Sequence, residues 1–177
     1  LYVGRIMRHK GIEYAIDAVD RDMRLIVAGV NYNEAYDRML RARALGSAVE
    51  FAGRVDDAAL PSLYGRALAT VVPSVYRTWG GGETVVPELL GLVALESMAC
   101  ATPVIVSSVG SLPELVEDGV TGFVVPPNDA GAIRAALRLL RDDPARRAEM
   151  GRRARASILA RFTWEATARR CFEAYAA

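Results

Sequence analysis

The chain contains few of the side chains that build disulfides or metal sites. Its 177 residues include two cysteines, Cys100 and Cys171, and one histidine, His9. Two cysteines are too few for a disulfide scaffold, so we expect a reducing compartment and a cytoplasmic location. One histidine without a neighbouring cysteine cannot build a metal site. We therefore expect no bound metal and no cofactor.

Long apolar runs are also missing. No run reaches the roughly 20 residues that a membrane-spanning helix needs. The opening residues, Leu1 to Arg5, lack the basic and apolar regions of a signal peptide, and the chain does not begin with Met, so we expect a piece of a longer polypeptide. With 52% apolar and 24% charged residues, the composition excludes intrinsic disorder and is typical of one globular domain over residues 1–177.

Lysine is nearly absent, because 21 of the 22 basic residues are arginine and the one lysine is Lys10. An ammonium group is compact and a guanidinium group is a planar fork, so the two cations are not interchangeable. The single lysine therefore indicates a position that needs the ammonium group.

Positive charge is concentrated toward the C-terminus. Residues 134–177 carry 11 arginines against five acidic residues, a net charge of +6, whereas residues 1–133 have a net charge of −5. The basic segment is consistent with a nearby phosphate-rich or anionic lipid surface, and equally with a solvated helix face. We expect peripheral membrane contact at most, and no nucleic-acid partner.

Apolar strand patterns alternate with helix patterns along the whole chain. Uniformly apolar strands of this kind predict the α/β class, a doubly wound and mostly parallel sheet with helices on both faces. In such sheets, ligands bind at the carboxyl ends of the strands. The expected strands are 1–3, 25–28, 49–52, 68–72, 104–106 and 122–125, and the expected helices are 11–19, 34–45, 57–64, 90–100, 112–116, 129–141, 144–161 and 163–177.

Local signals set several of these helix boundaries. Asp57 is the expected N-cap of the third helix, and Thr163 is the expected N-cap of the last one, where we expect Trp164 to pack against the body. Residues 74–88 form a long irregular stretch, which in a compact domain is usually functional or mobile.

Two cations follow the first strand in the pattern Gly4-Arg5-x-x-x-x-Lys10-Gly11. Both precede a helix, and the glycines let the backbone approach a ligand closely. Arg5 and Lys10 are therefore candidates to clamp a diphosphate, with two exposed loop cations as the alternative. His9 beside Lys10 is expected to be an exposed structural residue, with a hydrogen bond to phosphate as the alternative.

Two acids, Glu88 and Glu96, are separated by seven residues. Eight residues of helix rise span roughly 12 Å, about the reach from a ribose across two phosphates to a hexose. Between the acids, the amides of residues 90–93 begin a helix and favour an anion. We expect Glu96 to need a partner, because its helix is apolar nearly all round.

Taken together, these motifs resemble the C-terminal domain of the GT-B-fold retaining glycosyltransferases of family 4. The resemblance covers essentially the whole chain in order. It rests on Gly4-Arg5 with Lys10-Gly11, Pro73-Ser74, Glu88-x7-Glu96, Pro103-Val104-Ile105, the segment 110–116, Asp118-Gly119-x-x-Gly122 and the run 126–129.

The resemblance implies a Rossmann-like half of a GT-B fold that binds a nucleoside-diphosphate sugar without metal. Arg5 and Lys10 would bind the diphosphate of the donor and stabilise the leaving group, Glu88 would hold the donor hexose, and Glu96 would hold the ribose. The backbone of Gly4 and of Leu90, Gly91, Leu92 and Val93 would contact phosphate and sugar, and the loop around Val55 would lie near the base. The acceptor site would belong to an N-terminal domain absent from this chain, so the chain alone would be inactive.

Some residues depart from the family pattern. Leu89 and Leu90 follow the first acid where the family usually has glycine and an aromatic residue, and Ala101 stands where a glycine is usual. Two rival functions stay open: a non-catalytic nucleotide-binding or interaction module, and a GT-B-fold epimerase or phosphorylase. Lys10 is the only lysine and is assigned to phosphate, which argues against a pyridoxal-phosphate-dependent phosphorylase.

Overall fold

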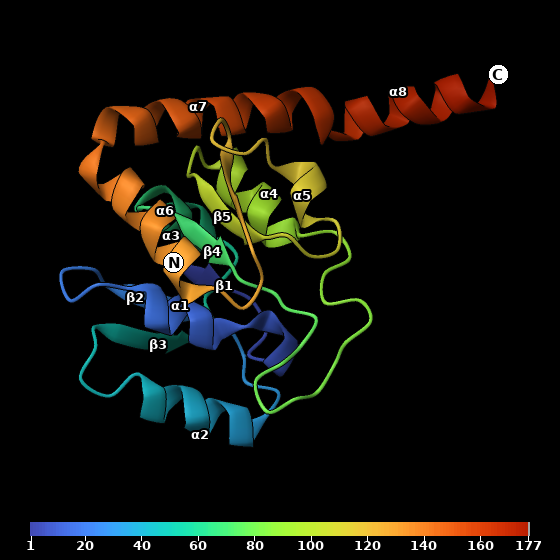
Figure 1. Cartoon of the computed structure of the whole chain (residues 1–177). Helices are drawn as coiled ribbons and strands as arrows, with labels where there is room; N and C mark the ends of the chain where they lie inside the picture. Colours follow the sequence, from blue (N-terminus) through green and yellow to red (C-terminus); the bar gives the residue numbers. More distant parts are fainter. Residues whose placement is uncertain (177) are drawn as a thin grey trace.

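The computed structural model describes residues 1–176 and confirms the α/β class. Strands and helices alternate along the chain, with three helices in succession at its end (Figure 1). The strands are β1 (Tyr2–Val3), β2 (Leu25–Ala28), β3 (Val49–Gly53), β4 (Thr70–Val72), β5 (Val104–Ser107) and β6 (Gly122–Val125). The helices are the 3-10 helix η1 (Arg8–Lys10) and the α-helices α1 (Ile12–Ala18), α2 (Glu34–Arg43), α3 (Leu60–Gly65), α4 (Leu92–Ala99), α5 (Leu112–Leu115), α6 (Ala130–Asp142), α7 (Pro144–Arg161) and α8 (Trp164–Tyr175).

All paired strands are parallel, as the sequence predicts, but they form two three-stranded sheets. The orders are β1-β2-β3 and β4-β5-β6. The edges β1 and β4 are joined by two backbone hydrogen bonds: the amino group of Leu1 donates to the carbonyl of Ala69 over 2.9 Å, and the amide of Val71 donates to the carbonyl of Leu1 over 2.8 Å. The spatial order is therefore β3-β2-β1-β4-β5-β6, and the strand order reverses between β1 and β4, where ligands bind in such folds.

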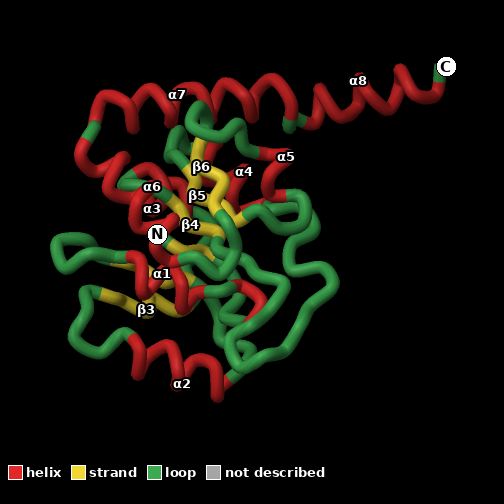
Figure 2. Tube along the Cα trace, viewed as in Figure 1, coloured by secondary structure: helices red, strands yellow, loops and turns green. Residues whose placement is uncertain are grey.

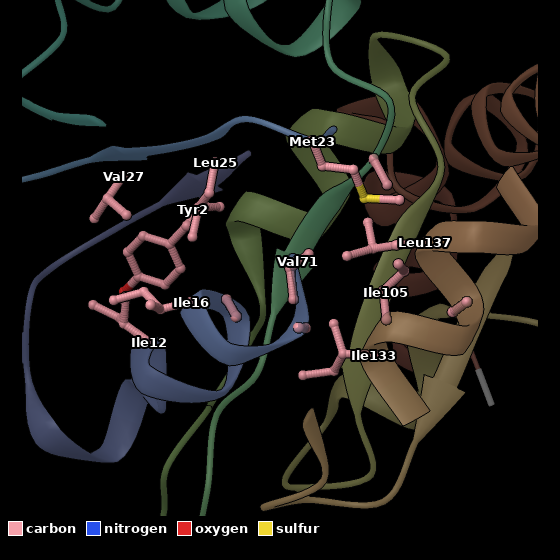
Figure 3. Packing of buried hydrophobic residues seen from close by; sticks show 14 of the residues in the cluster. Tyr2, Ile12, Ile16, Met23, Leu25, Val27, Val71, Ile105, Ile133 and Leu137 are labelled. Carbon is pink, nitrogen blue, oxygen red and sulfur yellow. The ribbon is translucent and has the colours of Figure 1, made fainter. Parts of the chain in front are cut away.

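Helices cover both faces of the second sheet, because successive side chains of a strand point to opposite faces. Val71 and Ile105 belong to a buried cluster with α1 and α6, whose Ile133 and Leu137 pack beside them (Figure 3). Val72, on the other face, belongs to a second buried cluster that is built largely from α4, α5 and α7. This double cover explains why β4 and β5 are buried at every position, including the polar Thr70 and Ser107.

Most predicted elements lie within two residues of their expected positions, but one capping prediction is wrong. Asp57 does not cap α3, which begins at Leu60 with Ala59 as its N-cap. The reason is a turn before the helix, in which the carbonyl of Asp56 accepts hydrogen bonds from the amides of Ala59 and Leu60. The predicted cap at Thr163 is confirmed, since its side chain accepts from the amide of Ala166.

The last helix, α8, extends away from the body of the molecule (Figures 1 and 2). No residue of α8 in the described part of the chain is buried, and the side chain of Trp164 is 87% exposed. The prediction that Trp164 packs against the body is therefore wrong, because a helix that projects from the body offers it no surface. None of the helices within residues 1–176 combines the length and apolar content needed to cross a lipid bilayer.

The packing of α7 against the turn after α4 generates a stability prediction. A Cβ atom on Gly151 would lie 2.1 Å from the carbonyl oxygen of Ala101. Alanine favours a helix over glycine by about 1 kcal/mol, but overpacking against rigid backbone costs up to about 3 kcal/mol or more. We expect Gly151→Ala to lower the free energy of unfolding by at least about 1 kcal/mol, measured by urea denaturation.

Gly65→Ala is the matched control, because Gly65 also lies in a helix and a Cβ there would meet nothing within 4 Å. We expect Gly65→Ala to leave the free energy of unfolding unchanged or to raise it by less than about 1 kcal/mol. Equal stability of Gly151→Ala and the unmodified chain would contradict the close packing of α7.

Candidate functional site

A cleft of about 380 Å³ lies at the carboxyl ends of β1 and β4. We call it the main cleft. It joins the loop after β1 to the segment before α4, which are more than 70 residues apart in the sequence. Its walls are Tyr2, Val3, Gly4, Arg5, His9, Lys10, Val72, Val86, Pro87, Glu88, Leu89, Leu90, Gly91, Leu92 and Val93. The structure thus brings together eight of the ten predicted site residues, all except Glu96 and Val55.

Two glycines allow the close backbone contacts that shape this cleft. Gly11 ends η1 with a φ of 62°, and a Cβ there would lie 2.1 Å from the carbonyl oxygen of Pro73. Gly110 has a φ of 52°, and a Cβ there would lie 2.2 Å from the carbonyl oxygen of Glu88. Only glycine fits such positions without strain. The first contact seats Lys10 beside the end of β4, and the second seats Glu88 against the loop after β5.

Lys10 and Glu88 form an ion pair at the centre of the main cleft. Their Nζ and Oε2 atoms are 2.6 Å apart, and the two side chains are only 14% and 15% exposed. The fully buried Ser74 donates a second hydrogen bond to the same carboxylate oxygen over 3.2 Å. Sequence reasoning assigned Lys10 and Glu88 to different parts of a ligand, and their direct pairing was not anticipated.

Arg5 supplies the second positive charge. Its side chain is exposed, and it forms no ion pair within the described residues. Its backbone is fixed, because the hydroxyl of the buried Tyr2 donates to the carbonyl of Arg5 over 2.8 Å. A guanidinium group in this position is available to an anion in the main cleft.

The start of α4 adds partial positive charge on the opposite wall. Gly91 is the N-cap, and the first turn contains no acidic residue. The amides of Leu92 and Val93, in that turn, have no helical acceptor, and the helix dipole favours an anion there. The helix begins at Leu92, just after the start at Leu90 or Gly91 that the sequence predicts. Two cations and a helix start therefore face one cleft.

Glu96 lies one turn further along α4, outside the lining of the main cleft. The expectation of a glutamate in a buried helix is wrong, because Glu96 and Leu92 are exposed on α4. The expected partner is nevertheless present: the hydroxyl of Tyr64 donates to Oε2 of Glu96 over 2.8 Å. Burial, followed by the bond to Glu96, raises the pKa of Tyr64.

Val55 lines a smaller hollow of about 190 Å³ that shares Val3, Gly4 and Arg5 with the main cleft. We call it the side hollow. Tyr32 and Arg54 also line it. A ligand held at Arg5 can therefore extend from the main cleft into the side hollow.

His9 also lines the main cleft and is half-buried, so the expectation of an exposed structural residue is wrong. Burial lowers its pKa below the usual 6.5, and the charges of Lys10 and Arg5 lower it further. The sequence signal for His9 was its position beside Lys10. Ser74 belongs to the Pro73-Ser74 pair of the family resemblance, but the sequence predicts no role for it or for Tyr64, since a tyrosine in an amphipathic helix is typical of ordinary packing.

A metal-binding cluster and a second cavity are the alternatives to the main cleft as a functional site. Among residues 1–176, no three His, Cys, Asp or Glu side chains gather in a way that could hold a metal ion. A larger cavity of about 540 Å³ is lined mostly by apolar residues, with Val55 and the charged Arg24, Glu50 and Arg66 also in its walls. Because Arg24 and Glu50 pair with each other, whereas two cations and a helix start converge on the main cleft at the point where the strand order reverses, the main cleft is the better candidate.

Comparisons with known proteins identify the family of the chain. The sequence profile of the glycosyl transferases group 1 family matches residues 1–157. A glycogen synthase of Mycobacterium tuberculosis is 36% identical over 185 residues, covering 100% of this chain and 42% of that protein. The chain thus spans less than half the length of this relative.

Solved structures show the same fold. Sucrose-phosphate synthase from Thermosynechococcus elongatus has a TM-score of 0.81 and 36% identity, covering 98% of this chain and 43% of that one. Anabaena HepE in complex with UDP has a TM-score of 0.86 and 24% identity, covering 99% and 47%, and HepE has also been solved with UDP-glucose. The chain therefore belongs to the group 1 family of glycosyl transferases and has the fold of a GT-B C-terminal domain.

Proposed function

We propose that this chain is the donor-binding domain of a glycosyltransferase that takes a hexose from a nucleoside-diphosphate sugar. The observation that carries the proposal is the convergence of Arg5, Lys10 and the start of α4 on the main cleft. Two cations and a helix N-terminus suit a diphosphate, which carries several negative charges in a small volume. Complexes of HepE with UDP and UDP-glucose support the same ligand class for this fold.

In this proposal, each part of the donor contacts a different group of residues around the main cleft. Arg5, Lys10 and the backbone of residues 90–93 bind the diphosphate, with Gly4 allowing its close approach. Glu88 accepts hydrogen bonds from hexose hydroxyls at the centre of the cleft, and Glu96 accepts from the ribose. Val55 in the side hollow lies near the base.

The ion pair between Lys10 and Glu88 exchanges partners when the donor binds. A phosphate oxygen takes the place of the carboxylate beside Lys10, whose ammonium group can donate three hydrogen bonds. Glu88 keeps the hydrogen bond from Ser74 and is then available to the sugar. The pair holds both side chains in the cleft before the ligand arrives, which reduces the entropy that binding must overcome.

Transfer breaks the bond between the anomeric carbon of the sugar and a phosphate oxygen. The electron pair of that bond stays with the nucleoside diphosphate, and the acceptor hydroxyl supplies the new bond to carbon and gives its proton to the departing phosphate oxygen. Arg5, Lys10 and the start of α4 stabilise the growing negative charge, and each placed donor contributes about 3 kcal/mol to lowering the barrier. We propose that these groups replace a metal ion, and that transfer proceeds with retention as in the family 4 enzymes.

We further propose that a second, N-terminal domain of the same polypeptide supplies the acceptor site. The chain covers 42% of the glycogen synthase relative, which leaves room for such a domain in the whole protein. Catalysis requires both substrates to be positioned together. The chain of residues 1–177 should therefore bind the donor weakly and transfer nothing.

For the location of the protein, we propose the cytoplasm, with peripheral contact at an anionic membrane. Arg169 and Arg170 are exposed on α8, together with the aromatic side chains of Trp164 and Phe172. Basic and aromatic side chains of this kind are attracted to anionic lipid headgroups.

The first test is a calorimetric titration of the 177-residue chain with UDP, GDP and ADP. We expect at least one of them to bind, and Lys10→Ala to weaken that binding roughly tenfold to hundredfold, because a charge-assisted hydrogen bond is lost. Arg38→Ala is the control, since Arg38 is an exposed cation on α2 that contacts Glu34 outside the cleft. Absence of binding by all three nucleotides would refute the donor site.

The second test concerns transfer by the whole polypeptide that carries this domain. We expect Lys10→Ala and Glu88→Ala each to abolish sugar transfer while thermal unfolding still shows a folded protein. Near-normal turnover in either variant would contradict the assigned roles. A wild-type polypeptide that binds donor and transfers to no acceptor would instead favour the non-catalytic module.

The third test uses His9, the single histidine, whose NMR resonances need no assignment. In the free chain its pKa should lie below 6.5, so the unfolded state binds more protons and the folded state loses stability as pH falls below 6.5. Pyrophosphate in the main cleft should raise the pKa of His9, because phosphate charge stabilises the imidazolium. If pyrophosphate leaves the pKa of His9 unchanged, the diphosphate does not bind in the main cleft.

A further inference from the structure

Tyr64 combines complete burial with a hydrogen bond to an exposed candidate binding residue. Its side chain is 1% exposed, and its hydroxyl donates to Oε2 of Glu96 over 2.8 Å. Within residues 1–176, the other carboxylate oxygen of Glu96 makes no hydrogen bond. The carboxylate is thus held at one oxygen from inside the protein and is open to a ligand at the other.

Neither Tyr64 nor Glu96 lines the main cleft or the side hollow, but both lie near them. Leu92 lines the main cleft and precedes Glu96 by four residues on α4, whereas Leu60 lines the side hollow and precedes Tyr64 by four residues on α3. Residues four apart share a helix face and are about 6 Å apart along the axis. The hydrogen bond therefore lies one helical turn from the lining of each cavity.

A buried framework fixes Tyr64 independently of Glu96. The hydroxyl of Thr102 donates to the backbone carbonyl of Tyr64 over 2.8 Å, and Thr102 is 3% exposed. Ser97, on the buried side of α4, donates to Thr70 of β4 over 2.8 Å. The two ends of the Tyr64–Glu96 contact are thus tied to the turn before β5 and to β4, so the position of the tyrosine hydroxyl determines the position of the carboxylate.

From these contacts we infer that Tyr64 is a positioning residue that orients the carboxylate of Glu96 toward a vicinal diol. The inference rests on the proposed function, because it takes the diol to be the ribose of the donor. Held by Tyr64, Glu96 presents one oxygen in a fixed direction, and a ligand need not immobilise the side chain when it binds. The benefit exists only for a ligand that carries the ribose hydroxyls.

The test compares ribonucleotides with 2′,3′-dideoxynucleotides in calorimetric titrations of the 177-residue chain. The probes are UDP, GDP and ADP and their dideoxy analogues. We expect Tyr64→Phe to weaken binding of the ribonucleotide that binds best by roughly fivefold to tenfold, and to change dideoxynucleotide binding by less than about twofold. Glu96→Gln should also weaken only the ribonucleotide, and adding Tyr64→Phe to it should have no further effect, since the two act through one contact.

Thr102→Val is the matched control. It removes a buried hydrogen bond to the backbone of the same tyrosine and leaves the bond to Glu96 intact. We expect it to lower thermal stability and to change both affinities by less than about twofold. Equal weakening of both nucleotides by Tyr64→Phe and Thr102→Val would assign Tyr64 a purely structural role and overturn the inference.

The failures of the two proposals are distinguishable. Loss of ribonucleotide affinity in Glu96→Gln without any loss in Tyr64→Phe overturns the positioning role and leaves the donor site standing. No effect of Glu96→Gln overturns the ribose assignment and the inference together, while Lys10→Ala still tests the diphosphate. No binding of any nucleotide refutes both proposals.

A second measurement needs no variant, so it remains decisive if Tyr64→Phe does not fold. In the unmodified chain labelled with ¹³C-tyrosine, the bound ribonucleotide should shift the Cζ resonance of Tyr64 through Glu96. Tyr36 is the internal control, because it is 1% exposed and donates to Glu13 in the core. An unchanged Cζ resonance of Tyr64, or equal shifts of the Tyr64 and Tyr36 resonances, would contradict the inference.

Discussion

The site depends on the backbone junction between β1 and β4. Both strands are short, and two hydrogen bonds through Leu1 hold their edges together. This junction fixes the carboxyl ends of the two strands side by side, so the loop with Arg5 and Lys10 faces the segment with Glu88 and the start of α4. Without it, the two halves of the candidate phosphate clamp would belong to separate three-stranded sheets.

The electrostatics of the main cleft follow from that juxtaposition. A lone ammonium group in a mostly buried position would be costly, and Glu88 compensates its charge while the cleft is free of ligand. Arg5 and the helix start remain uncompensated, which leaves the cleft attractive to an anion. The same arrangement explains why Ser74 is buried against Glu88, because a carboxylate that gives up its cation still needs a hydrogen-bond donor.

Departures from the family pattern also have physical consequences. Ala101 has a φ of 57°, the left-handed conformation that favours glycine, at the turn where α7 approaches α4. Leu89 and Leu90 are 76% and 64% exposed on the wall of the main cleft, so they place apolar surface where the family usually has glycine and an aromatic residue. Ala101 therefore affects the stability of the fold, whereas Leu89 and Leu90 affect the shape of the main cleft.

The sequence alone determined the α/β class, the parallel strands and nearly all helix positions, because apolar periodicity, glycines and prolines act locally. It also predicted Arg5, Lys10 and Glu88 as candidate site residues, which line one cleft in the structure, since cations at the end of a strand and an acid before a helix are local signals. The structure alone showed the pairing of Lys10 with Glu88, the place of His9 in the cleft and the bond from Tyr64 to Glu96. It likewise overturned the Asp57 cap and the packing of Trp164. The Asp57 cap fails for a local reason, the turn in which the carbonyl of Asp56 accepts from the amides of Ala59 and Leu60. The other features depend on contacts between residues more than 30 positions apart, or on which surfaces lie next to a helix, and such relations arise only when the chain is folded.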